Sequence, residues 1–166
     1  NNLATNYSDL GETHKALEIN LEVVRKRKIV LGEEHQDYLT SLNNLAINYL
    51  DLGLYKECIE INQDVSNRTK MLYGDDHPGH LLSLANLAVA YSKSGQLNNS
   101  LEINLLVCEK RKSTLGEDHP DYLTSLNNLS SVYTDLGQYD KAMTINLEVS
   151  EKRRKVLGEN HPYFIN

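Results

Sequence analysis

The 166-residue chain has only two cysteines, no excess of positive charge and no apolar run of the roughly eighteen residues that span a membrane. Cys58 and Cys108 fall at unrelated places in helical patterns, so we expect no disulfide framework and a reducing, cytoplasmic setting. The net charge of −6 argues against general nucleic-acid binding, and no segment resembles a signal peptide. These features predict a soluble globular protein that binds neither nucleic acid nor a membrane.

What the chain does contain is one spacing, 42 residues, that runs from end to end. The stretch from Asp37 to Leu45 recurs unchanged from Asp121 to Leu129. The same residue returns at several places in every repeat: Gly11, Gly53, Gly95 and Gly137; Tyr7, Tyr49, Tyr91 and Tyr133; Asn20, Asn62, Asn104 and Asn146; His35, His77, His119 and His161. Such repetition predicts one supersecondary unit stacked several times, with the core distributed between neighbouring units.

Each unit has the pattern of a helical hairpin. From residue 37 onward, apolar residues recur at the spacing of one helical face, and Gly53 follows as a residue able to close a helix C-terminus. A second helical pattern begins at Tyr55 and ends at Gly74, and Pro78 is suited to start the next helix. The predicted helices are 1–10, 13–31, 37–52, 55–73, 79–94, 97–115, 121–136 and 139–157.

Two positions in each hairpin carry only small residues, which predicts that the two helices cross closely there, because a leucine would force the axes apart. On the first helix these residues are Ala4, Ala46, Ala88 and Ser130, and on the second they are Ala16, Cys58, Ser100 and Ala142.

These residues resemble the tetratricopeptide pattern, here Leu45-Ala46, Tyr49, Gly53-Leu54-Tyr55 and Cys58. The usual tetratricopeptide period is 34 residues. The 42-residue form, with its Leu115–Pro120 linker and the run Leu126–Leu129, is similar to the repeats of kinesin light chains. The resemblance implies an all-α, right-handed α-solenoid of four tandem hairpins over residues 1–166. The repeats fall at about 1–36, 37–78, 79–120 and 121–162, with 163–166 as the stub of another.

The resemblance also implies a binding groove, because the first helices of tetratricopeptide arrays line a concave face. The candidate peptide-binding residues are Asn43, Asn44, Ile47, Asp51, Asn86, Val89, Lys93, Asn127, Asn128 and Ser131. Of these, Asn44, Asn86 and Asn128 match the asparagine that grips the ligand backbone in related repeats, and a carboxamide can bracket a peptide bond. The alternative is that these asparagines only bridge adjacent helices. Lys93 is the one basic residue among the candidates, which disfavours a clamp for a C-terminal carboxylate.

Other recurrent residues have a structural interpretation. We expect the asparagine ladder (Asn20, Asn62, Asn104 and Asn146) to be buried in a cross-repeat hydrogen-bond network, the weaker alternative being that it reaches into a ligand site. Basic residues gather in the last turns of the second helices, where they complement the helix dipole. The histidines of the linkers are expected to pack against or cap the helix starts rather than to bind a metal. The third repeat diverges most, with Gly79-His80 in place of Asp-Tyr and Ala85 in place of asparagine.

The predicted function is a protein-interaction scaffold that binds an extended peptide along the groove, with no enzymatic activity, cofactor or metal. No nucleophile–base pair, phosphate-binding glycine loop or close carboxylate pair is apparent in the repeats. The alternative is a structural spacer or a self-association module of a larger receptor or enzyme. We also expect head-to-tail self-association, because neither end of the array has the polar capping unit that closes most solenoids.

Overall fold

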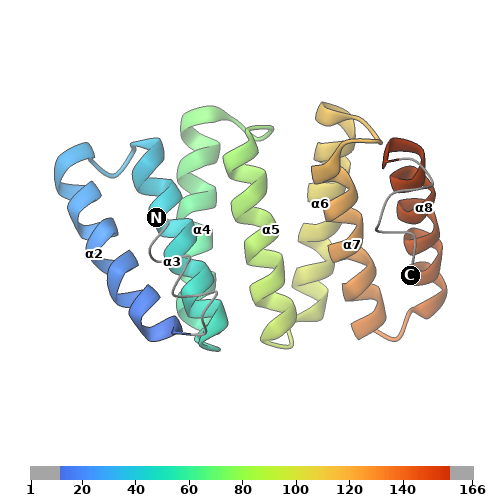
Figure 1. Cartoon of the computed structure of the whole chain (residues 1–166), viewed down its shortest axis with the longest axis horizontal. Helices are drawn as coiled ribbons and strands as arrows, with labels where there is room; N and C mark the ends of the chain where they lie inside the picture. The colour runs from blue at the N-terminus through green and yellow to red at the C-terminus, as the bar shows by residue number, and fades with distance from the viewer. Residues whose placement is uncertain (1–11, 158–166) are drawn as a thin grey trace.

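The computed structural model describes residues 12–157, and all regular secondary structure in this range is α-helical. The helices are α2 (Thr13–Leu31), α3 (Gln36–Asp51), α4 (Tyr55–Tyr73), α5 (Pro78–Lys93), α6 (Leu97–Leu115), α7 (Pro120–Asp135) and α8 (Tyr139–Leu157). In Figure 1 they follow one another across the molecule in chain order, from α2 at one end to α8 at the other. The prediction of an all-α solenoid is confirmed, whereas the helix predicted at 1–10 and the stub at 163–166 lie outside the described residues.

The hairpins stack so that their first helices form one layer and their second helices another. Each helix packs against the next along the chain, and contacts also join α3 to α5 and α5 to α7. Among residues 12–157, the second helices α4, α6 and α8 make no contacts of similar extent with one another. An array whose first helices are closer together than its second helices curves toward the first helices. The concave face is therefore built from α3, α5 and α7.

A histidine caps the start of the first helices α3, α5 and α7. The Nδ1 atoms of His35, His77 and His119 each accept a hydrogen bond of 3.1 Å from the backbone N–H two residues later. The capping prediction is confirmed for these three residues, and His161 lies outside the described part of the chain. Because the histidine is the N-cap, α3, α5 and α7 begin and end one residue earlier than predicted. The second helices have the predicted bounds.

The small residues predicted to lie at the helix crossings are buried throughout residues 12–157, and Ala4 lies outside the described part of the chain. Ala46 and Cys58 share one buried cluster with Ala90. The hydroxyl of Ser130 donates a hydrogen bond of 3.1 Å to the carbonyl oxygen of Ala142. Burial raises the pKa of the Cys58 thiol to about 11, so this side chain stays protonated and serves packing.

In the divergent third repeat, the imidazole ring of His80 is buried at the position where the neighbouring repeats have the buried tyrosines Tyr38 and Tyr122. His80 is 7% exposed, and its Nδ1 lies 3.0 Å from the carbonyl oxygen of Ser66. A carbonyl only accepts, so Nδ1 carries the proton in this contact. Burial lowers the pKa of His80, which favours a neutral imidazole at pH 7.

The asparagine ladder is only partly as predicted. Asn20, Asn62 and Asn104 are at most 4% exposed, but Asn146 is exposed because no helix of the described chain covers the outer face of α8. The predicted cross-repeat bond is present at Asn20, whose Nδ2 donates to Oδ1 of Asn48 at 2.6 Å. The next two asparagines instead donate at 3.0 Å to carbonyls of their own helices, those of Cys58 and Ser100. The prediction that the ladder is largely buried and hydrogen-bonded is confirmed for these three residues, but only Asn20 bonds across repeats.

The reason lies in the residue that faces each asparagine from 28 positions further along the chain. The facing residue is Asn48 for Asn20, but it is Ala90 for Asn62 and Val132 for Asn104, and neither apolar side chain can hydrogen-bond. The apolar side chains explain the missing cross-repeat bond, whereas an Oδ1 atom buried without a partner is common to Asn20, Asn62 and Asn104.

Candidate functional site

Within residues 12–157, two cavities lie along the concave face, one between α3 and α5 and one between α5 and α7. The larger, of about 470 Å³, is bounded by α3 and α5 and by the C-terminal end of α4. Its apolar lining includes Leu39, Ile47, Tyr73 and Leu82. Ile47 and Leu82 are 43% and 46% exposed, so this part of the groove presents apolar surface to a ligand.

The smaller cavity, of about 250 Å³, lies between α5 and α7 and is more polar. Asn128 and Ser131 line it from α7, and Asn104 lines it from α6. The hydroxyl of Ser92 on α5 donates a hydrogen bond of 3.0 Å to Oδ2 of Asp135 on α7, which bridges the two first helices beside this cavity.

Eight of the ten predicted site residues line one of the two cavities. Asn43, Asn44, Ile47 and Asn86 line the larger, and Val89, Lys93, Asn128 and Ser131 line the smaller. Asp51 and Asn127 line neither, although both lie on first helices.

The asparagine pairs differ in how far they reach solvent. The three asparagines assigned to backbone contact, Asn44, Asn86 and Asn128, are half-buried, as a ligand contact requires. Asn43 was expected to be at least partly accessible but is only 8% exposed, and its Oδ1 has no partner. Its counterpart Ala85 is also buried, whereas the third residue at this position, Asn127, is half-buried.

Sequence reasoning missed the residues that enlarge the first cavity. Arg27 and Arg111 occupy one repeat position, and each guanidinium donates to the backbone oxygen of the aspartate that begins the next hairpin, at 2.6 and 3.0 Å. The second unit has Thr69 in place of the arginine and Gly79 in place of the aspartate, and both line the larger cavity. The replacement of both residues in one unit is the sequence signal that could have located the cavity.

Arg111 itself lines the larger cavity from α6 and is 7% exposed. Its Nη1 also donates to the hydroxyl of Ser125 at 2.9 Å. Burial lowers the pKa of this guanidinium, but an arginine remains charged at neutral pH. The groove therefore has a cation that comes from a second helix, α6. The sequence did not indicate this contribution.

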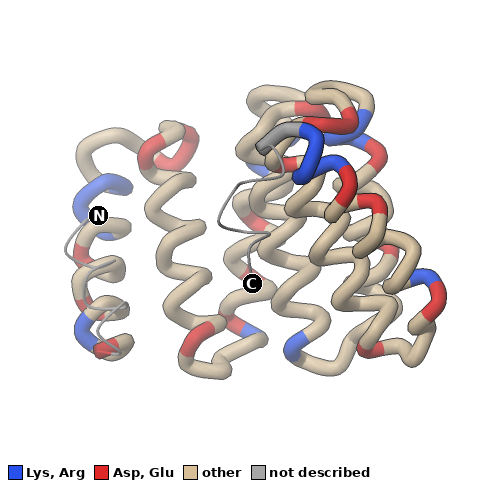
Figure 2. The backbone as a smooth tube through the Cα atoms, turned by 45° about the vertical axis from the view of Figure 1, so that its right-hand side comes forward, with Lys and Arg blue, Asp and Glu red and all other residues tan. Residues whose placement is uncertain are grey.

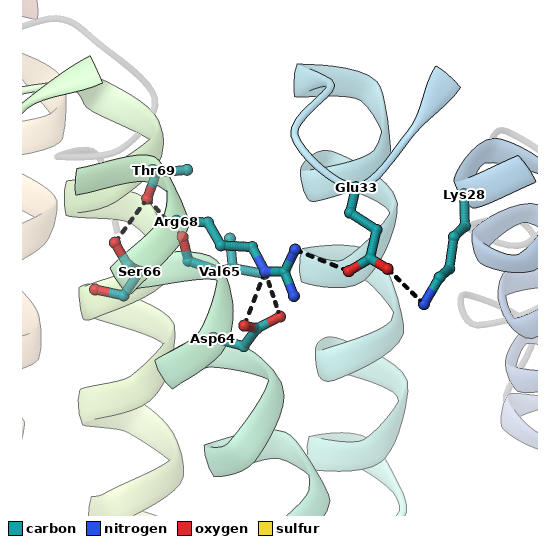
Figure 3. A network of polar contacts seen from close by, with 7 residues as sticks. All are labelled: Lys28, Glu33, Asp64, Val65, Ser66, Arg68 and Thr69. Carbon is teal, nitrogen blue, oxygen red and sulfur yellow. Dashed lines mark hydrogen bonds and ion pairs between the residues drawn. The ribbon is translucent and has the colours of Figure 1, made fainter. Parts of the chain in front are cut away.

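The basic residues at the ends of the second helices are neutralised by acids of the linkers. Figure 2 shows basic and acidic stretches adjoining one another at helix ends. Glu33 illustrates the arrangement, since it pairs with Lys28 of its own repeat at 2.7 Å and with Arg68 of the next at 2.9 Å (Figure 3). Glu117 repeats it with Lys112 at 2.7 Å and Lys152 at 2.8 Å. These ion pairs connect neighbouring units, which favours the structural interpretation of the basic residues.

Protonation of Glu117 at low pH is expected to lower the thermal stability of the array. The hydrogen bonds from Lys112 and Lys152 lower the pKa of this carboxyl from 4.5 to about 2. A lowered pKa in the folded state stabilises the fold above pH 4.5, and this contribution is lost as the pH falls toward 2. Thermal unfolding of the wild type should therefore lose more stability between pH 5 and pH 2 than that of Glu117→Gln. The effect is modest because the pair is exposed, and equal pH profiles would contradict this assignment.

Comparison with known proteins agrees with this architecture. Tetratricopeptide repeat models match residues 1–37, 41–112 and 123–163 of the sequence. The crystal structure of a putative kinesin light chain from Podosopora anserina, with nearly identical TPR-like repeats, is 30% identical, with a TM-score of 0.75. The match covers 94% of this chain and 74% of that one. This chain belongs to the tetratricopeptide repeat family.

Further structures share the tetratricopeptide fold. A variant of the Podosopora anserina protein matches at a TM-score of 0.78 and 30% identity, over 93% of this chain and 73% of that one. BtubC (BKLC) from P. vanneervenii has a TM-score of 0.81 at 22% identity, over 96% of this chain and 63% of its own. No curated protein matches the sequence.

Membership of this family makes the array a protein–protein interaction scaffold of the kinesin-light-chain-like type. Of the helices within residues 12–157, none combines the length and the apolar character needed to cross a membrane.

Proposed function

We propose that the tetratricopeptide array binds an extended segment of a partner protein along the concave groove formed by α3, α5 and α7. The observation that carries the proposal is the placement of Asn44, Asn86 and Asn128. These half-buried carboxamides occur once per repeat and line the two cavities of one groove. Each offers one acceptor and two donors, the complement of a peptide backbone.

The spacing of the first helices suits an extended ligand. Packed helices lie about 8–10 Å apart, and an extended chain advances about 3.3 Å per residue. Successive asparagines would therefore meet the ligand backbone about every three residues, and a segment of about six residues would span all three.

The lining of the groove supports a ligand of mixed polarity. Leu82, Ile47 and Val89 present apolar surface, whereas a structural spacer would have a groove that is polar throughout. We assign the apolar side chains of the ligand to the larger cavity, where Leu39 and Tyr73 add to the apolar wall.

Changing Asn44, Asn86 and Asn128 together to alanine is expected to weaken peptide binding about tenfold to a hundredfold. Each substitution removes the hydrogen bonds of one amide, worth about 1 kcal/mol. Binding is measured by screening the protein against a positional-scanning library of short peptides. The peptide that binds most tightly is then titrated to obtain its dissociation constant.

The matched control is the double variant Asn67→Ala, Asn98→Ala, which removes two exposed asparagines from the second helices α4 and α6. The control should bind as the wild type does. Unchanged binding by the groove variant, or an equal loss in the control, would refute the proposal.

Self-association is the second candidate, and one surface favours it. The side chains of Tyr139, Met143 and Leu147 on α8 are 68%, 64% and 57% exposed and follow one another at a spacing of four residues. Residues at this spacing share a helix face, so they form an apolar strip of the kind that marks interaction sites.

A further inference from the structure

Asn104 is a buried polar residue that the packing of the array does not satisfy. It is 2% exposed, and its Oδ1 has no hydrogen-bond partner. A buried acceptor without a partner costs about 1–3 kcal/mol, so its presence calls for an explanation.

The orientation of the Asn104 amide is determined by its own helix. Nδ2 donates to the carbonyl oxygen of Ser100 at 3.0 Å. A carbonyl cannot donate, so the amino group must face it and Oδ1 must point away from that contact. Val132 on α7 is at the repeat position of Asn48 and lines the same cavity, and its side chain supplies no donor. The oxygen therefore needs a donor from outside the protein fold.

Asn62 provides an internal comparison. It occupies the same repeat position, is 0% exposed and donates in the same way to the carbonyl of Cys58. Its Oδ1 also lacks a partner. However, Asn104 lines the 250 Å³ cavity of the groove, whereas Asn62 lines neither groove cavity. Of the ladder asparagines whose Oδ1 lacks a partner, only Asn104 lines a groove cavity, where a ligand can supply the missing donor. Asn43, on the first helix α3, lines the larger cavity with its own unpartnered Oδ1.

We propose that the smaller cavity is a subsite for an uncharged hydrogen-bond donor, the side-chain amide of glutamine or asparagine, which donates to Oδ1 of Asn104. This inference rests on the proposed binding of a peptide in the same groove. It adds to that function a preference for one class of side chain, at the ligand position that meets α5 and α7.

The charges around the cavity balance, because Lys93 and Asp135 both line it, and a cavity without net charge favours an uncharged donor over a cation. The carboxylate of Asp135 already accepts the hydroxyl of Ser92. A primary amide avoids the cost of burying a charge, and its own carbonyl can accept from Ser131 or from the Lys93 ammonium.

The test uses the full chain and a positional-scanning library of short peptides. The wild type should select glutamine or asparagine at one position of the bound peptides. Replacing that residue with norleucine should weaken binding about tenfold, the loss expected for one hydrogen bond to a buried acceptor. In Asn104→Leu, which keeps the side-chain shape but removes the acceptor, the selection should disappear. In Asn62→Leu, the matched control, it should remain.

Folding of both variants is verified by circular dichroism, and side-chain amide NMR supplies a second readout. Acetyl-glutamine amide should shift the Nδ2 signals of Asn104 but not those of Asn62, and acetyl-norleucine amide should shift neither. Selection of lysine or arginine, absence of any side-chain amide preference, or its persistence in Asn104→Leu would overturn the subsite. If peptides bind without the preference, the subsite alone fails, and if no peptide binds, the proposed groove function fails with it.

Discussion

Ala88→Leu is expected to lower the free energy of unfolding by about 2–3 kcal/mol, because it overpacks the place where α5 and α6 cross. Ala88 is 0% exposed. Its counterpart Ala46 lies in one buried cluster with Cys58, and its counterpart Ser130 reaches the carbonyl of Ala142. These contacts show that the position holds the two helices of a hairpin at close range, so three added carbons must push the axes apart.

The measurement is thermal and urea unfolding, with an expected fall in the melting temperature of about 5–10 °C. Thr124→Leu is the matched control, because Thr124 is exposed and its counterpart in the third repeat is already Leu82. The control should change stability little. A stability of Ala88→Leu equal to that of the wild type would show that the helices do not depend on a small residue at the crossing.

Asn62→Leu is expected to raise the free energy of unfolding by about 1–2 kcal/mol. The substitution keeps the shape of the side chain and removes a buried Oδ1 that has no partner. The lost hydrogen bond matters little, because its acceptor is a helix carbonyl, that of Cys58, which the helix backbone can satisfy without the side chain. An apolar residue also fits the facing side chain of Ala90 better than an amide does.

Urea unfolding of Asn62→Leu beside the wild type measures the gain. Asn20→Leu is the contrasting variant, because Asn20 donates to Oδ1 of Asn48 and its removal leaves that buried acceptor without a partner. We expect Asn20→Leu to be less stable than Asn62→Leu. Strong destabilisation by Asn62→Leu would mean that the amide satisfies a group essential to the fold.

Features that recur in every repeat could be predicted from the sequence. The ends of α2, α4 and α6 follow from the glycine after each of them, and the close crossings follow from the small residues. The first helices begin one residue early for a local reason, because the side chain of His35 and its counterparts takes the N-cap position. This detail depends on the rotamer of the histidine, which the 42-residue pattern does not specify.

Features that depend on contacts between different repeats can be found in the sequence only when positions from two repeats are compared. Whether a ladder asparagine bonds across repeats depends on the residue that faces it, which is Asn48 in one junction and Val132 in another. The larger cavity requires two departures from the repeat, Thr69 and Gly79, to lie side by side in space. Their separation in the sequence conceals this proximity, because each is an unremarkable substitution when considered alone.

The central claim is that a partner segment lies along α3, α5 and α7. It is tested most directly by a crystal structure of the full chain with the peptide that binds best from the library. We expect an extended peptide backbone hydrogen-bonded to the carboxamides of Asn44, Asn86 and Asn128, with an apolar side chain in the larger cavity. A peptide bound to the second helices or to the apolar strip on α8, with the three asparagines uncontacted, would contradict the account.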